Sequence, residues 1–385
     1  MFSRARILGI GRTPFFRDSQ RSVLSLALEA TEMACSDAGI EPTSLDASVT
    51  YAIDDSIPAL SVLNALGCEQ ISWFTDLAGG GNVSLTSLLQ AAMVVEAGLA
   101  ERVVVFRAIN GRSESRLGGK GKSIAAVGGL QYTAPVGWTT YGQFDAMMAR
   151  RHMELYGTTT EHFGSVALAA RSWASANPAA VKREPLTMEE YERSPLVSSP
   201  FRLLDFCQES DCAFAVVIGS GGTSAWPSRE VQFVSGVHGG GPRPGGDNWG
   251  HIEFREHAST FSHWLRERLY ARAGIGADDI DALYLYDCFT FSVIGQLEGF
   301  GFAAAGEGGP LAASGAIAPG GRLPLNSHGG LLSEGYGHGM NHVYEAVVQV
   351  RDEAGERQLP GVELALVTGG ATTTGCAVVL GKGCM

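Results

Sequence analysis

Two similar segments lie far apart in the sequence, and they constrain the fold more than any other feature. Residues 211–222 read DCAFAVVIGSGG, and residues 374–383 read TGCAVVLGKG. Both are apolar, contain a cysteine near their start and close on a Gly-x-Gly turn. A repeat of this kind indicates a duplicated unit with a boundary near residue 225. We therefore predict an N-terminal half over 1–225 and a C-terminal half over 226–385.

Between these segments, short apolar stretches alternate with helical patterns. Strands are predicted at 5–10, 102–107, 231–238, 281–287, 362–370 and 374–380, and helices at 23–38, 82–98 and 260–273. Such alternation is typical of an α/β fold with a largely parallel sheet. From about 109 to 200 the pattern changes, with a glycine-rich stretch at 117–129, helices near 143–156 and 160–176, and a proline-bearing linker at 185–200. This region is predicted to be a lid inserted into the first half.

The net charge of −12 argues against a protein that binds nucleic acid, because that affinity rests on Lys and Arg neutralising phosphates. The N-terminal sequence MFSRARILGIGRTPF contains an apolar run far shorter than a membrane span or the apolar region of a signal peptide. We expect a cytoplasmic protein without a membrane span.

The seven cysteines show no CxxC spacing, so reduced thiols are expected rather than a zinc site. His338 and His342 are four residues apart, as two ligands on one helix face would be, but no HExxH carboxylate accompanies them. We therefore predict that this chain binds no metal.

Two tyrosines are placed where α/β proteins bind ligands, at the ends of strands and the starts of helices. Tyr286 begins the segment YDCF at the end of a predicted strand, and Tyr336 lies in the glycine-rich stretch GLLSEGYGHGMNHVYEA at 330–346. Either residue could instead be an amphipathic residue at the edge of the core. The glycines of AGGGN at 78–82 offer N–H groups that could hold an oxyanion, although close packing would also require them.

The segments that carry these residues resemble thiolase-like enzymes, within them the sterol-carrier-protein-x branch. The resemblance extends over nearly the whole chain and is carried by GIGRTPF, DLAGGGNVSLTSLLQAA, YDCF, NSHGGLLSEGYGHG and VTGGATTTGCAVVL. It implies a duplicated five-layer α/β/α/β/α thiolase fold that acts on acyl-CoA, with CoA as part of the substrate and no other cofactor bound by this chain.

The departures from the family pattern concern its catalytic residues. Gly81 stands where thiolases carry the nucleophilic cysteine, so no thiol can be acylated there. The second thiolase cysteine corresponds to Val367 or Thr368, and Cys376 does not obviously replace it. Tyr336 and Tyr286 stand where the thiolase Gly-His-Pro motif and the sterol-carrier His-Asp-Cys-Phe motif have histidines.

With tyrosines at both places, the chain most resembles the thiolase-like aldolases of steroid side-chain degradation. The resemblance implies retro-aldol cleavage of a β-hydroxyacyl-CoA, such as a 17-hydroxy-pregnene carboxyl-CoA, to a 17-ketosteroid and propionyl-CoA. It also implies an accessory protein with a zinc ribbon and an OB-fold. We predict a homodimer flanked by two accessory subunits, a heterotetramer.

Retro-aldol chemistry requires a base for the β-hydroxyl, a site for the enolate oxygen and an acid for the α-carbon. We predict Tyr286 and Tyr336 as the acid/base pair without assigning which is which. His338 is expected to hydrogen-bond the thioester oxygen or orient Tyr336, with a purely structural role as the alternative. Asp287 could orient its neighbours, but we favour a cap on the helix at Phe289. The remaining candidates, for the oxyanion and the substrate, are Gly80, Gly81, Asn82, Asn326 and His328.

The basic residues of the lid and the function of the chain each have more than one interpretation. Arg150, Arg151 and His152 could contact the CoA phosphates or form a solvated helix face. The alternative functions are a thiolase or other carbon–carbon bond enzyme that uses a different nucleophile, for which Cys288 is the plausible thiol, and a non-catalytic lipid or acyl-CoA binding protein.

Overall fold

The computed structural model describes residues 2–114, 130–242 and 259–383 of the 385-residue chain. The glycine-rich stretch at 117–129 and Cys384 lie outside these ranges. None of the helices within the described ranges is long and apolar enough to cross a membrane.

The strands form one nine-stranded sheet, in the order β3-β2-β4-β7-β1-β8-β11-β10-β9. Its strands are β1 (Ala5–Arg12), β2 (Ala47–Ala52), β3 (Trp73–Ala78), β4 (Arg102–Asn110), β7 (Asp211–Ser220), β8 (Val231–Gly240), β9 (Ala282–Tyr284), β10 (Leu364–Gly369) and β11 (Thr374–Lys382). The first five strands in this order precede residue 225 and the last four follow it. A short ladder of β1 on β8, at Arg6 with Gln232 and Ile7 with Val231, joins the two groups. This arrangement supports our proposal of a division near residue 225.

The prediction of a largely parallel sheet was wrong. Within the described ranges, five of the eight strand pairings of this sheet are antiparallel. The turn between β10 and β11 is too short for a crossover connection, so these two strands must run antiparallel. Parallel pairing remains where β2 meets β3 and β4, and where β9 meets β10.

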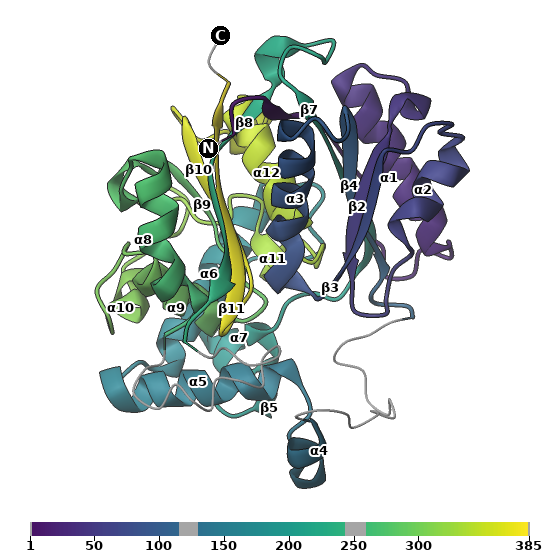
Figure 1. Cartoon of the computed structure of the whole chain (residues 1–385). Coiled ribbons are helices and arrows are strands. Elements are labelled where there is room, and N and C mark those ends of the chain that lie inside the picture. Colours follow the sequence, from purple (N-terminus) through teal and green to yellow (C-terminus); the bar gives the residue numbers. More distant parts are fainter. Residues whose placement is uncertain (1, 115–129, 243–258, 384–385) are drawn as a thin grey trace.

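Two buried helices lie between the groups of strands, as Figure 1 shows. Helix α3 (Ser84–Glu96) buries nine of its thirteen residues, and α12 (Met340–Val350) buries ten of eleven. Burial on every side requires packing partners on both faces, and each of these helices contacts strands of both groups. The outer layers are α1 (Val23–Ala38) with α2 (Ala59–Leu66) on one side and α8 (Phe261–Ala273) on the other. The layers are therefore α/β/α/β/α, as predicted.

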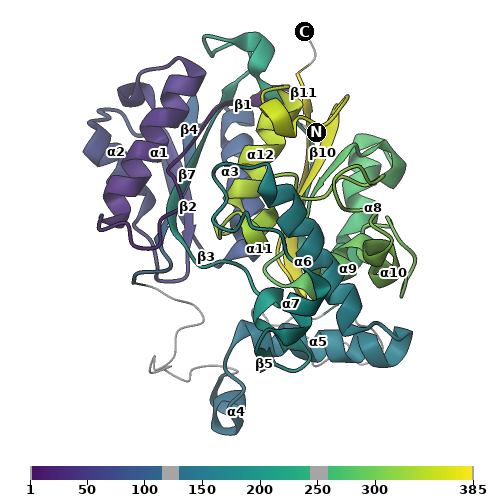
Figure 2. The same cartoon turned by 180° about the vertical axis from the view of Figure 1, so that it is seen from behind.

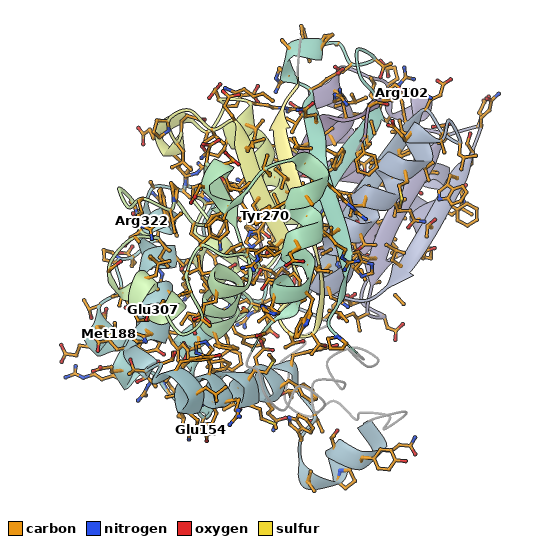
Figure 3. All side chains as sticks on the ribbon, turned by 60° about the vertical axis from the view of Figure 1, so that its left-hand side comes forward. Arg102, Glu154, Met188, Tyr270, Glu307 and Arg322 are labelled. Carbon is orange, nitrogen blue, oxygen red and sulfur yellow. The ribbon has the colours of Figure 1, made fainter. Side chains whose placement is uncertain are left out.

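The region between β4 and β7 lies across one end of these layers, as Figures 1 and 2 show. It contains α4 (Leu130–Thr133), α5 (Tyr141–Tyr156), α6 (Thr160–Ser175), α7 (Met188–Arg193), β5 (Leu196–Ser198) and β6 (Phe201–Arg202). The labelled Glu154 and Met188 of this region lie at the far end of the molecule from Arg102, which begins β4 (Figure 3). Helix α6 packs on α9 (Thr290–Gly299), α10 (Gly308–Ala313) and α11 (Gly330–Ser333), so this lid is anchored to the C-terminal half.

Candidate active site

A cavity of about 960 Å³ lies where the lid meets both groups of strands. Its wall includes six of the predicted site residues, which are Gly80, Gly81, Asn82, Tyr286, Tyr336 and His338. These residues come from the start of α3, the end of β9 and the loop between α11 and α12. The fold therefore gathers candidates that are more than 200 residues apart in the sequence.

The hydroxyl groups of Tyr286 and Tyr336 lie 2.8 Å apart and are hydrogen-bonded to each other. Both side chains are buried, with 3% and 7% of their surface exposed. Burial raises the pKa of each phenol well above its ordinary value of about 10. The two tyrosines therefore both keep their protons at neutral pH, and together they form a protonated, hydrogen-bonded pair.

The backbone of Tyr286 is held in place because β9 ends at Tyr284, three residues earlier than predicted. The freed Tyr286 N–H donates to Thr368 Oγ1 at 2.8 Å, and Gln296 Nε2 donates to Tyr286 O at 2.9 Å. Thr368 is one of the two positions aligned with the second thiolase cysteine. In this structure the Thr368 hydroxyl accepts the hydrogen bond that holds the backbone of Tyr286.

Gly81 is required by the position of Tyr286. A Cβ at residue 81 would lie 2.1 Å from Cζ of Tyr286 and 2.2 Å from its hydroxyl oxygen, far inside van der Waals contact. The tyrosine thus fills the space into which any side chain at residue 81 would project. A cysteine at 81 and a tyrosine at 286 exclude each other in this backbone arrangement.

His338 lies on the other side of Gly80, in a left-handed conformation with φ of 55°. Its Nδ1 is contacted by two nitrogens of Arg107, at 3.2 and 2.9 Å, and Arg107 also pairs with Asp55 at 2.6 Å. Since a guanidinium only donates, Nδ1 must accept, which leaves the imidazole proton on Nε2. Burial, followed by the Arg107 charge, lowers the pKa of His338 to about 3. The ring is therefore neutral, with an N–H donor facing the cavity wall at Gly80.

Arg107 was missed by the sequence analysis, which placed it at the end of an apolar strand. It is 1% exposed, and its guanidinium lies over the ring of Tyr51. Tyr51 in turn donates from its hydroxyl to His338 O at 2.7 Å. The signal in the sequence was a charged residue within the otherwise buried run RVVVFR.

Gly80 and Asn82 line the cavity, but the Asn82 side chain serves the loop itself. Its Oδ1 accepts from Gly80 N at 3.1 Å, and its Nδ2 donates to Thr374 Oγ1 at 3.3 Å. The segment Gly81–Val83 forms a short 3₁₀ turn that leads into α3. The first N–H groups of such a turn have no partner inside it, so they remain the candidate oxyanion donors.

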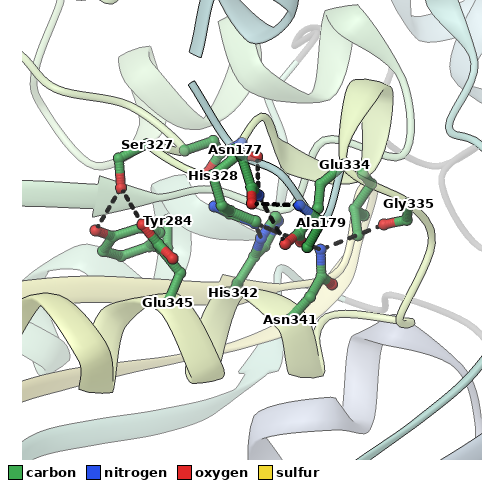
Figure 4. A network of polar contacts seen from close by, with 12 residues as sticks. Asn177, Ala179, Tyr284, Ser327, His328, Glu334, Gly335, Asn341, His342 and Glu345 are labelled. Carbon is green, nitrogen blue, oxygen red and sulfur yellow. Dashed lines mark hydrogen bonds and ion pairs between the residues drawn. The ribbon is translucent and has the colours of Figure 1, made fainter. Parts of the chain in front are cut away.

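Asn326 and His328 do not line the cavity. Asn326 Nδ2 donates to Leu285 O at 3.0 Å, and His328 Nε2 lies 3.0 Å from Nδ1 of His342. Figure 4 shows His328 within a buried network that also contains Asn177, Glu334 and Asn341. Arg12 of β1 pairs with Glu334 at 2.8 Å. This network fixes the loop that carries Tyr336.

The prediction that Asp287 caps the helix at Phe289 was wrong. Its carboxylate instead accepts from Leu331 N at 2.8 Å and Leu332 N at 3.3 Å, so it caps α11. Its Oδ1 also lies 3.1 Å from Nε2 of His342. A Cβ at Gly330 would lie 2.0 Å from Asp287 Oδ2, and Gly330 has φ of +62°, so a glycine is required there. Asp287 thereby ties the Tyr286 segment to the Tyr336 loop.

Two further expectations concern histidines. His338 precedes α12 and His342 lies within it, so they do not share one helix face, and no group of three possible metal-ligating side chains occurs in the described ranges. His152 is 1% exposed and contacts Thr158 and Glu298, so it cannot meet CoA phosphates on the surface. Arg150 and Arg151 line a separate, outer pocket of about 380 Å³.

Comparison of the sequence with known proteins gives full-length relatives. A steroid side-chain-cleaving aldolase of Thermomonospora curvata is 38% identical over 399 residues, covering 98% of this chain and 97% of the relative. The 17-hydroxy-3-oxo-4-pregnene-20-carboxyl-CoA lyase of Mycobacterium tuberculosis is 36% identical over 390 residues, covering 98% and 99%. Residues 266–382 match the family described as thiolase C-terminal domain-like.

Comparison with solved structures agrees with these relatives. The Ltp2-ChsH2(DUF35) aldolase superposes with a TM-score of 0.90 and 37% identity, covering 98% of both chains. A monomeric SCP2-thiolase-like protein of Mycobacterium smegmatis gives a TM-score of 0.74 at 19% identity, covering 100% of this chain and 78% of that one, and so supports the fold alone.

Proposed function

The chain belongs to the family of thiolase-fold, steroid side-chain-cleaving aldolases, and we propose that Tyr286 and Tyr336 carry out its retro-aldol chemistry. It is a lyase that cleaves a steroid β-hydroxyacyl-CoA. The observation that carries the assignment of the two tyrosines is their 2.8 Å hydrogen bond at the cavity wall, with no nucleophilic side chain at residue 81.

The neutral pair can act as a proton relay. In one concerted step, one tyrosine accepts the β-hydroxyl proton of the substrate while its own proton passes to the other tyrosine, and the second tyrosine delivers its own proton to the α-carbon. The bond between the α- and β-carbons breaks as the alcohol becomes a ketone. The electron pair of that bond, partly delocalised onto the thioester oxygen as in an enolate, forms the new C–H bond. The net result is ketone plus shortened acyl-CoA, with both tyrosines restored, and no step requires a free phenolate.

The enolate oxygen needs donors that are in place before the reaction. We assign this role to Nε2 of His338, which carries the proton because Arg107 occupies Nδ1. The N–H groups of Gly81 and Asn82, at the start of the Gly81–Val83 turn, are the second candidates. A neutral imidazole donor, rather than an imidazolium, fits the lowered pKa of His338.

The two relatives indicate the substrate class. The first is a steroid side-chain-cleaving aldolase, and the second is a lyase of 17-hydroxy-3-oxo-4-pregnene-20-carboxyl-CoA. For this chain we propose that substrate, with a 17-ketosteroid and propionyl-CoA as products. A cavity of about 960 Å³ is at the upper end of ordinary ligand sites, which suits a four-ring acyl group. Arg17, Arg112 and Lys182 also line it and would attract the CoA phosphates.

We propose an accessory partner of the DUF35 type, because the Ltp2-ChsH2(DUF35) aldolase, on which this chain superposes, is named with such a protein. A zinc ribbon and an OB-fold in that partner, a homodimer of this chain and a heterotetrameric assembly are part of the same proposal.

The decisive test is turnover. The chain is co-expressed with its DUF35 partner and incubated with the 17-hydroxy steroid β-hydroxyacyl-CoA, and propionyl-CoA and the 17-ketosteroid are followed by mass spectrometry. We expect both products in equal amounts. Binding of the acyl-CoA without either product would contradict the aldolase proposal and favour a non-catalytic acyl-CoA binding protein.

A mechanism in which Cys288 is the nucleophile predicts a different result from the tyrosine relay. Cys288 lines the cavity, but its burial raises the pKa of its thiol well above the ordinary value. We expect the Cys288→Ala variant to keep kcat/KM within about threefold of the wild type, whereas losing a nucleophile costs several orders of magnitude. Steady-state kinetics of the variant measure this. A loss of a thousandfold with normal folding would instead support the alternative enzyme that uses Cys288.

A further inference from the structure

Asp145 is a buried carboxyl group without a counterion or a hydrogen bond among the described residues. It lies in the second turn of α5, is 1% exposed and belongs to the cavity wall. Neither of its carboxyl oxygens has a hydrogen-bond partner within the described ranges. Burial alone raises the pKa of Asp145 well above its ordinary value. The group therefore faces the cavity as a neutral carboxylic acid.

An unpartnered buried polar group lowers the stability of a protein by about 1–3 kcal/mol. Buried carboxyl groups are almost always paired, so an exception that lines a ligand cavity indicates a partner that arrives with the ligand. A neutral carboxyl has one O–H donor and can also accept, which makes it a suitable contact for one carbonyl or hydroxyl oxygen.

The surroundings of Asp145 indicate which part of the substrate its carboxyl group contacts. Gly142, one turn earlier on α5, packs so closely on Phe206 that a Cβ there would lie 2.6 Å from its ring. Phe206 meets Phe289 edge to face at 5.2 Å, and both line the cavity. A Cβ at Gly142 would also lie 3.6 Å from the Phe289 ring, and Cys288, the neighbour of Phe289, lines the same cavity. Asp145 is therefore on the Phe206, Cys288 and Phe289 side of the cavity, which is aromatic and apolar.

The cations that line the cavity belong to segments other than α5. Arg17 lies before α1, Arg112 follows β4, Arg171 is in α6, and Lys182 lies between α6 and α7. The CoA phosphates would be drawn to these residues, whereas a neutral carboxyl group offers a phosphate no positive charge. The apolar wall is thus suited to the ring system of the acyl group.

We propose that Asp145 is a specificity residue whose neutral carboxyl donates a hydrogen bond to a carbonyl oxygen on the ring system of the acyl-CoA, remote from the bond that breaks. This inference rests on the proposed function and adds the part of the substrate that Asp145 recognises. It accounts for a polar group kept in an apolar wall at a cost in stability.

The test compares two β-hydroxyacyl-CoA thioesters with the same four-ring skeleton, one with the ring carbonyl and one with a methylene in its place. For the wild-type complex we expect kcat/KM to favour the carbonyl compound by about tenfold to a hundredfold. In Asp145→Leu this ratio should fall to about one, because the donor is gone. In Asp145→Asn, whose amide can still donate, it should stay within about threefold of the wild type.

Met148→Leu is the control variant. It changes a buried residue of α5 that does not line the cavity, and it should keep the wild-type ratio of kcat/KM for the two thioesters. Asp145→Leu should unfold at a higher temperature than wild type, because an unpartnered polar group is removed. The ratio of dissociation constants for the two thioesters, measured by calorimetry, should follow the same pattern even if turnover of both is absent, which separates this inference from the proposed function. No wild-type preference, or an unchanged ratio in Asp145→Leu, would overturn it, as would an equal loss on both compounds.

Discussion

Tyr286→Phe and Tyr336→Phe are each expected to lower kcat for carbon–carbon cleavage by about 10²- to 10⁴-fold, the usual contribution of a positioned acid or base. Each change removes one hydroxyl group and keeps the ring, so the packing of both rings is retained. Because both tyrosines belong to one relay, loss of either interrupts the same proton path. The double variant should therefore be little slower than the slower single variant.

Single-turnover mass spectrometry of propionyl-CoA release measures the chemical step, and calorimetry with the intact acyl-CoA measures binding. The dissociation constant should change by less than about tenfold, since one neutral hydrogen bond contributes about 0.5–1.5 kcal/mol. Tyr270→Phe is a matched control, because the Tyr270 hydroxyl is also buried but donates to Phe300 O and does not line the cavity. Wild-type kcat in either Tyr286→Phe or Tyr336→Phe would refute the relay.

Much of the fold follows from periodicity in the sequence. The helix predicted at 23–38 has these bounds in the structure, because Ser22 caps its start and Gly39 ends it with φ of 66°. The prediction of a largely parallel sheet was wrong, because the hydrophobic pattern of one strand does not specify which strand pairs with it or in which direction that strand runs. β7 pairs with β4 and β1 only after the whole lid has intervened, and no local signal encodes that pairing.

Candidate site residues could be predicted from the sequence where they stand at motif positions, but not where their role depends on burial. Tyr286, Tyr336 and Gly81 stand at recognisable motif positions, and the structure brings them together. Arg107 and Asp145 carry no motif. Arg107 matters because it fixes the tautomer of His338, and Asp145 because it lacks a partner. Both properties depend on three-dimensional contacts with residues distant in the sequence.

The second large effect is expected from Gly81→Ala. The added Cβ would lie 2.1 Å from Cζ of Tyr286, whose backbone is held by Thr368 and Gln296 and cannot easily retreat. We expect the free energy of unfolding to fall by about 1–3 kcal/mol, as for other overpacked cores. The displaced hydroxyl should also lower kcat by about 10²-fold, because an error of about 1 Å in a reacting group has effects of that size.

A double-mutant cycle with Tyr286→Leu tests whether the tyrosine ring is the cause. Chemical denaturation should show Gly81→Ala to be much less destabilising in the Tyr286→Leu background, while cleavage stays absent. Gly276→Ala is the control, because its φ is −123° and the nearest atom to its added Cβ is 3.9 Å away. Wild-type stability and kcat in Gly81→Ala would mean that the loop yields without loss. If the clash is confirmed, a side chain at residue 81 and the tyrosine at residue 286 compete for one volume. This fold then holds either a thiol nucleophile or a tyrosine proton relay, so acyl transfer and retro-aldol cleavage exclude each other in a single active site.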